Sequence, residues 1–173
     1  MVRAWMGFVA LGAGLIHVAL VIGSTPQVGI PLLVVGAAEL AWGVIAFSRP
    51  ALPLPRVARI AAVVPILAWV VALVLSGSGT LAAGGIGGLR VLPMLLASLL
   101  DLAIAIGVTG MLRWSAAPGD SARFDRPLRP GRYLLGLAAG ALVVVALTTP
   151  ALAATEAGEG LSPSDLNQPG HGH

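Results

Sequence analysis

Five long apolar stretches constrain this chain more than any other feature of its sequence. A helix needs about 20 predominantly apolar residues to cross the hydrocarbon core of a bilayer. Stretches that reach or approach this length lie at residues 4–23, 28–47, 60–76, 91–112 and 133–152. They predict an all-α bundle of five transmembrane helices within residues 1–153. The polar residues 154–173, which include several Gly and Pro, are expected to form a disordered tail.

The composition excludes the main soluble alternatives. Hydrophobic residues make up 57% of the 173 residues and charged residues only 10%, whereas a soluble domain has roughly 25% charged residues. A single core could not hide so much apolar surface from water. A soluble enzyme, a disordered chain and a nucleic-acid-binding domain are therefore excluded for the chain as a whole. The sequence also lacks Cys and Lys, which excludes disulfides, thiolate chemistry and Schiff-base lysines.

The arginines predict how the helices are oriented. They precede the first stretch, separate the second from the third, and separate the fourth from the fifth, at Arg3, Arg49, Arg56, Arg59 and five positions from Arg113 to Arg132. With five crossings, these positions all fall on one side of the membrane, which the positive-inside rule makes cytoplasmic. We therefore expect a cytoplasmic N-terminus and an extracellular C-terminus. We also expect these arginine loops to contact anionic lipid headgroups, each basic residue contributing about 1 kcal/mol.

Three ionisable residues, His17, Glu39 and Asp101, interrupt the apolar stretches. On insertion scales an Asp at the helix centre costs about 2.5–3.5 kcal/mol, so such residues are expected to face other helices or water. A rise of about 1.5 Å per residue places Glu39 and Asp101 near the midplane, roughly 15 Å deep. The same rise places His17 roughly 9 Å below the outer surface. The three side chains can therefore be neighbours in the folded bundle.

Small residues share a helix face with each of these polar side chains, by the i, i+3 and i+4 spacing. Small residues let transmembrane helices approach closely. We therefore expect the first, second and fourth helices to pack along these faces. The predicted packing positions are Gly14, Gly36, Gly43, Ala97 and Ser98.

The polar residues allow three interpretations. The first is interhelical hydrogen bonding, which makes the chain a non-enzymatic membrane subunit that packs against a partner or a second copy. The second is a proton or metal-cation site for transport or sensing, because intramembrane acids mark such pathways and His with two carboxylates suits a divalent metal. The third is catalysis with Glu39 as general base, which no nucleophile–base spacing or HExxH motif supports. The sequence favours the first, keeps the second as the alternative, and predicts neither enzyme activity nor a required cofactor.

The tail carries a weaker metal-binding signal. It ends with His171-Gly172-His173, and two imidazoles can bind Cu(II), Ni(II) or Zn(II) weakly. These two histidines are therefore a second candidate metal site, although a flexible end offers no preformed geometry. The segment Ala151-Leu152-Ala153 matches an A-x-A cleavage site, and an Ala-rich helix end is the favoured interpretation.

Three short segments carry a resemblance to known proteins. They are Gly14-Leu15-Ile16-His17, Ala38-Glu39-Leu40 and Leu96-Ala97-Ser98-Leu99-Leu100-Asp101. These segments resemble small polytopic membrane proteins common in actinobacteria, which tend to carry a His in the first helix and acids or amides in the second and fourth. The resemblance covers about the first two-thirds of the chain. It implies the same topology and no particular chemistry, and it places the protein in the cytoplasmic (inner) membrane of a bacterium.

Overall fold

The computed structural model describes residues 2–49, 53–77, 90–115 and 130–159, and these residues form helices joined by turns, with no strand among them. The helices are α1 (Val2–Ala19), α2 (Pro26–Ser48), α3 (Pro55–Gly77), α4 (Val91–Ser115), α5 (Pro130–Ala153) and the short α6 (Glu156–Glu159). Helices α1 to α5 are each long and apolar enough to cross a membrane. This confirms the predicted all-α class and the five candidate spans.

Several helix ends differ from the sequence prediction. α1 ends at Ala19 and not near Gly23, because tight turns follow it and Gly23 adopts a positive φ of 82°. α3 and α5 begin earlier than predicted, at Pro55 and Pro130. Proline is favoured at the first position of a helix, where its missing N–H costs nothing. Charged residues near these two starts lower the local hydropathy, so the apolar pattern of the sequence placed both helix starts too late.

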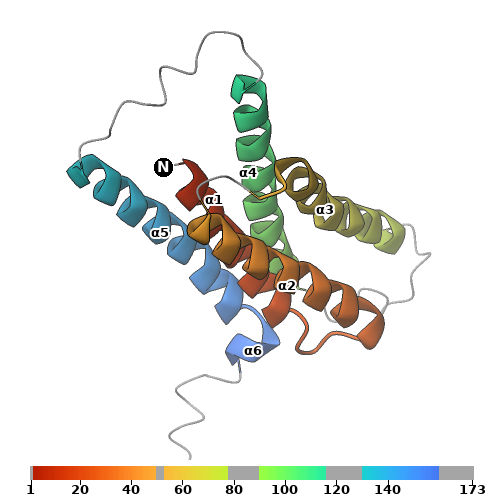
Figure 1. Cartoon of the computed structure of the whole chain (residues 1–173). Coiled ribbons are helices and arrows are strands. Elements are labelled where there is room, and N and C mark those ends of the chain that lie inside the picture. Colours follow the sequence, from red (N-terminus) through yellow and green to blue (C-terminus); the bar gives the residue numbers. More distant parts are fainter. Residues whose placement is uncertain (1, 50–52, 78–89, 116–129, 160–173) are drawn as a thin grey trace, which may run out of the picture.

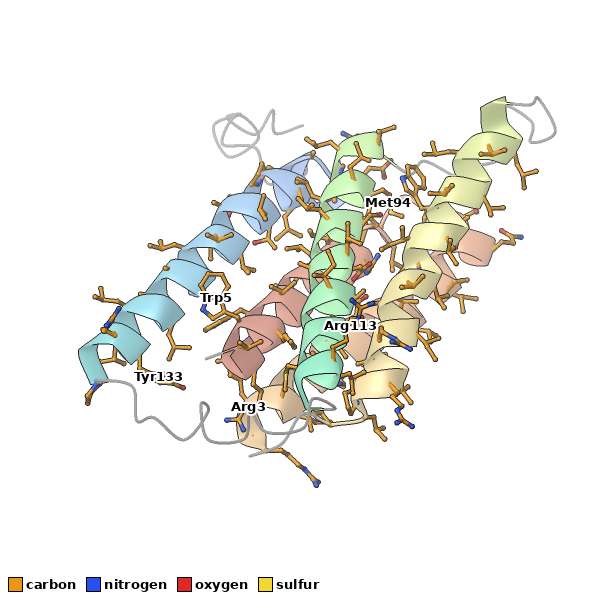
Figure 2. All side chains as sticks on the ribbon, turned by 90° about the horizontal axis from the view of Figure 1, so that it is seen from above. Arg3, Trp5, Met94, Arg113 and Tyr133 are labelled. Carbon is orange, nitrogen blue, oxygen red and sulfur yellow. The ribbon has the colours of Figure 1, made fainter. Side chains whose placement is uncertain are left out.

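The helix α1 is the centre of the bundle. It packs against α2, α4 and α5, whereas α3 packs mainly against α4 and scarcely touches α2. Figure 1 shows α2 lying across α1, and Figure 2 shows α4 between α5 and α3. Half of α1 is buried, compared with 22% of the apolar windows of α2, α3 and α5. The outward faces of these helices expose large apolar residues such as Val34, Leu67 and Leu142, which contact the lipid bilayer.

Backbone contact between α1 and α2 depends on glycine. A Cβ added to Gly14 would lie 2.8 Å from the carbonyl oxygen of Gly36, and a Cβ added to Gly36 would lie 2.9 Å from that of Gly14. Two turns further along α2, a Cβ on Gly43 would lie 3.0 Å from the carbonyl oxygen of Gly7. The structure therefore places three of the predicted packing glycines directly between these two helices.

The α4 packing positions lie on the other side of α1. Ala97 is fully buried in a core cluster that includes Ala13 and Ile16 of α1, whereas Ser98 is only half-buried. The N-terminal half of α1 packs against α5, where the ring of Trp5 covers Gly140 and its Nε1 donates a hydrogen bond to the Gly136 carbonyl oxygen at 2.9 Å. α1 is thus fixed by small residues on one side and by an aromatic ring on another.

The residues after α5 are partly ordered where the sequence predicts the start of a disordered tail. Ala154 and Thr155 form a turn, and α6 follows. Thr155 is buried, and its hydroxyl donates a hydrogen bond to the Leu152 carbonyl oxygen at 2.7 Å. The remainder of the tail, with His171 and His173, lies outside the described residues.

We expect Gly36→Ala to destabilise the bundle by about 1–3 kcal/mol, because the added Cβ forces two helix backbones apart. Thermal unfolding in detergent, followed by circular dichroism, measures the change. Gly131→Ala in α5 is the matched control, since a Cβ at that position meets no atom within 4 Å. Equal unfolding midpoints for the two variants would contradict the close contact between α1 and α2.

Candidate functional site

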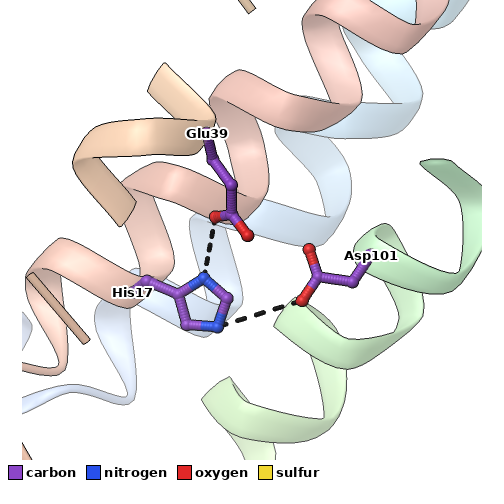
Figure 3. Close-up of side chains that lie close together, drawn as sticks. All are labelled: His17, Glu39 and Asp101. Carbon is purple, nitrogen blue, oxygen red and sulfur yellow. Dashed lines mark hydrogen bonds and ion pairs between the residues drawn. The ribbon is translucent and has the colours of Figure 1, made fainter. Parts of the chain in front are cut away.

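Three helices bring His17, Glu39 and Asp101 together in the interior of the bundle (Figure 3). His17 lies near the end of α1, Glu39 in the middle of α2 and Asp101 in the middle of α4. The His17 side chain is 1% exposed, that of Asp101 is 0% exposed and that of Glu39 is 13% exposed. We call these three residues the triad. The depth argument from the sequence and the observed convergence of the three residues agree.

The imidazole of His17 lies between the two carboxylates. Its Nδ1 is 2.8 Å from Oε2 of Glu39, which is a short hydrogen bond, and its Nε2 is 4.0 Å from Oδ2 of Asp101. Glu39 and His17 are therefore in direct contact, whereas Asp101 faces the ring without bonding to it (Figure 3). This asymmetry is not readable from the sequence.

The carboxylates of the triad retain unused acceptors. Among the described residues, Oε1 of Glu39 and both carboxylate oxygens of Asp101 are buried without a hydrogen-bond partner. Buried polar atoms are nearly always hydrogen-bonded in native proteins. An ionised carboxylate in an apolar interior is costly unless it is neutralised by a proton or a cation. The arrangement therefore calls for a positively charged species next to Asp101.

The hydrogen bond to Glu39 also prepares His17 to act as a ligand. In the neutral tautomer with the hydrogen on Nδ1, the Nδ1–H group donates a hydrogen bond to the carboxylate of Glu39. Nε2 then carries a lone pair that faces Asp101. Metal-binding histidines commonly donate their other ring N–H to a carboxylate in this way. One donor atom from each residue of the triad lies within 4.8 Å of the others. Bonds of about 2.1 Å to one metal ion keep donors within about 4.2 Å, so ligation of one ion by all three residues would require the side chains to move closer together.

Glu39 also faces a cavity that the sequence did not predict. The cavity has a volume of about 380 Å³ and lies where α2 and α3 scarcely touch, with α4 and Ala10 of α1 completing its wall. Its lining is apolar apart from Glu39 and Trp42. The Nε1 of Trp42 already donates a hydrogen bond to the Pro53 carbonyl oxygen at 2.9 Å. Glu39, whose Oε1 is buried without a hydrogen-bond partner, thus forms part of the wall of this cavity.

A further buried polar group lies on α3. The side chain of Trp69 is 3% exposed, and its Nε1 has no hydrogen-bond partner among the described residues. Trp69 belongs to the core cluster that contains Ala97 and Leu100, which are neighbours of Asp101 on α4. This position is that of a core-packing residue. The spacing of residues in the sequence does not indicate that the indole N–H of Trp69 lacks a hydrogen-bond partner among the described residues.

Comparisons with protein-family models, curated proteins and solved structures give no match. The function of this chain therefore has to be argued from its own residues.

We expect His17 and Asp101 to differ in their contribution to stability. His17→Ala removes a buried, hydrogen-bonded ring and leaves a cavity, so it is expected to cost about 2–4 kcal/mol. Asp101→Asn keeps the side-chain shape and removes a carboxylate with unpartnered oxygens, so it is expected to cost nothing. Unfolding of metal-free protein in detergent measures both. An equally large loss from Asp101→Asn would mean that Asp101 holds the helices together.

Proposed function

We propose that this protein is a small multi-pass membrane protein that binds a divalent metal cation at the triad, inside the bilayer, in exchange for protons. The observation that supports this proposal is the set of three buried, unpartnered carboxylate oxygens around one imidazole. Such a site serves the transport or the sensing of a cation. The proposed role is binding, and no covalent bond is made or broken in it.

Charge balance is the physical basis of the proposal. Two ionised carboxylates with a neutral His17 carry two negative charges, which a divalent cation neutralises completely. Without the metal, protons must supply the same charge, because two bare carboxylates close together in a low dielectric are strongly unfavourable. Metal binding therefore displaces protons. Imidazole with two carboxylates suits ions such as Zn²⁺ or Mn²⁺.

Each residue of the triad has a distinct part in this proposal. Nε2 of His17 and an oxygen of Asp101 are the first two ligands, since they face each other without being bonded. Oε2 of Glu39 holds the imidazole in that orientation through Nδ1, and the Glu39 carboxylate supplies the second negative charge that balances the cation. Water completes the coordination, which leaves the site open as in functional metal sites.

A purely structural role explains less of this geometry. Interhelical hydrogen bonding accounts for the pair of His17 and Glu39, whereas the oxygens of Asp101 are buried without a donor partner among the described residues. Polar contacts between membrane helices contribute only about 0.6 kcal/mol on average. The close packing of α1 on α2 is already provided by glycines. We therefore place the cation site, the alternative raised by the sequence, ahead of the packing role, and keep partner binding as a prediction.

Metal binding tests the proposal directly. Protein purified in detergent and stripped of metal is titrated with Zn²⁺ and with Mn²⁺ by calorimetry, and proton release is measured in weak buffer. We expect about one ion per chain at the triad. The affinity of Asp101→Asn and of His17→Asn for the ion is expected to be 10- to 100-fold weaker, which is the usual effect of losing a ligand or a residue that supports one. Lowering the pH weakens binding, because the ligands must lose protons first.

Two controls separate the triad from other acids and histidines. All titrations are made in the His171→Ala, His173→Ala background, so that the tail contributes no imidazole. Glu156→Gln changes an exposed acid of α6 outside the triad and is expected to bind as the parent protein does. Unchanged affinity in Asp101→Asn, or binding that disappears with the tail histidines alone, would refute the proposal.

We also propose that the end of the bundle with the arginines faces the cytoplasm. In the folded chain Arg3 of α1 donates a hydrogen bond to the Arg49 carbonyl oxygen at the end of α2, and Arg59, Arg113 and Arg132 lie near the matching ends of α3, α4 and α5. The positive-inside rule favours the cytoplasm for such an end.

The absence of native Cys makes this orientation measurable in intact cells. We expect Ser121→Cys, between α4 and α5, to be protected from a membrane-impermeant maleimide, and Ser164→Cys, after α6, to react with it. Labelling after cell lysis shows that both thiols are reactive. The reverse pattern, or equal labelling in intact cells, would contradict the proposed orientation.

A further inference from the structure

A second hollow lies on the lipid-facing side of α3 and α4, away from the triad. It is a groove of about 600 Å³, open to the outside, between the first half of α3 and the last half of α4. Its walls are mostly aliphatic, and its two charged residues are Arg59 and Arg113. The chief apolar residues of the wall are Ile60, Val64 and Leu67 of α3 and Ala105 and Ile106 of α4.

The two arginines lie at the same end of the groove. Arg59 belongs to the beginning of α3 and Arg113 to the end of α4, and both side chains are exposed. Figure 2 shows Arg113 at the end of α4 that lies opposite Met94. Among the described residues, neither the guanidinium of Arg59 nor that of Arg113 takes part in an ion pair or a hydrogen bond. Two positive charges are thus available at one end of an apolar groove.

The remaining wall of the groove leaves room for a chain of methylene groups. The hydroxyl of Thr109 donates a hydrogen bond to the Ala105 carbonyl oxygen at 2.6 Å, so its proton is already used. A Cβ added to Gly110 would meet no atom within 4 Å, which marks open space beside α4. From Arg59 to Leu67 the groove runs for about 12 Å along α3, at about 1.5 Å per residue.

We propose that this groove binds one anionic phospholipid, with the phosphate held between Arg59 and Arg113 and an acyl chain along the aliphatic wall. Guanidinium groups recognise phosphate oxygens through paired, charge-assisted hydrogen bonds. The apolar walls face hydrocarbon, so the bilayer itself supplies the matching chain. A net negative headgroup is favoured over a zwitterionic one, because the groove offers two cations and no acid. The site is separate from the triad and does not depend on the proposed metal function.

Lipid retention tests this assignment. The protein is reconstituted in nanodiscs with equal amounts of phosphatidylglycerol and phosphatidylcholine, then released into detergent and examined by native mass spectrometry. We expect one retained phosphatidylglycerol per chain, with little phosphatidylcholine. The double variant Arg59→Gln, Arg113→Gln is expected to retain at least tenfold less. The matched control is Arg56→Gln, Arg132→Gln, which removes two exposed arginines outside the groove and is expected to retain the lipid.

A second variant probes the apolar part while keeping both arginines. Gly110→Leu fills the open space beside α4 and is expected to reduce retention of phosphatidylglycerol to a similar extent. Inorganic phosphate added to the detergent solution distinguishes a lipid from a free anion, and we expect it to leave the retained lipid in place. Equal retention of both lipids, equal losses in the two double variants, displacement by phosphate, or full retention in Gly110→Leu would each overturn the proposal.

Discussion

The approach of α1 to α2 is the contact on which the candidate site depends. Gly14 and Gly36 let the two backbones meet, and one turn away the same approach brings His17 within hydrogen-bond distance of Glu39. Side chains larger than a hydrogen at these positions would hold the helices further apart than a 2.8 Å bond allows. Packing and polar chemistry are therefore two results of one close contact.

α1 also connects this pair to the third residue of the triad. It lies against α4 through Ala13 and Ile16, so that His17 reaches Asp101 on one side and Glu39 on the other. The imidazole of His17 lies within 4.0 Å of a carboxylate oxygen of each of the other two residues. The helix with the largest buried fraction among the five spans thus holds the central group of the triad. The apolar residues around it keep water away and strengthen each electrostatic interaction.

The sequence predicts the spans and the depth of the polar residues because both follow from simple geometry. Residue counting places Glu39 and Asp101 near the midplane, and the i, i+3 and i+4 spacing identifies Gly14 and Gly36 as packing positions. The end of α1 at Ala19 and the start of α3 at Pro55 were missed, since they depend on turn conformation and proline more than on hydropathy. The bond of His17 to Glu39 and not to Asp101 depends on how the helices rotate against each other, which no single-helix pattern contains.

The weak contact between α2 and α3 gives the bundle an unequal stiffness. α1, α2, α4 and α5 are joined around one centre, while α3 is attached mainly along α4. The space left beside α2 is lined in part by Glu39. A bundle joined in this way is expected to deform first along the side of α2 and α3, next to the side chain of Glu39.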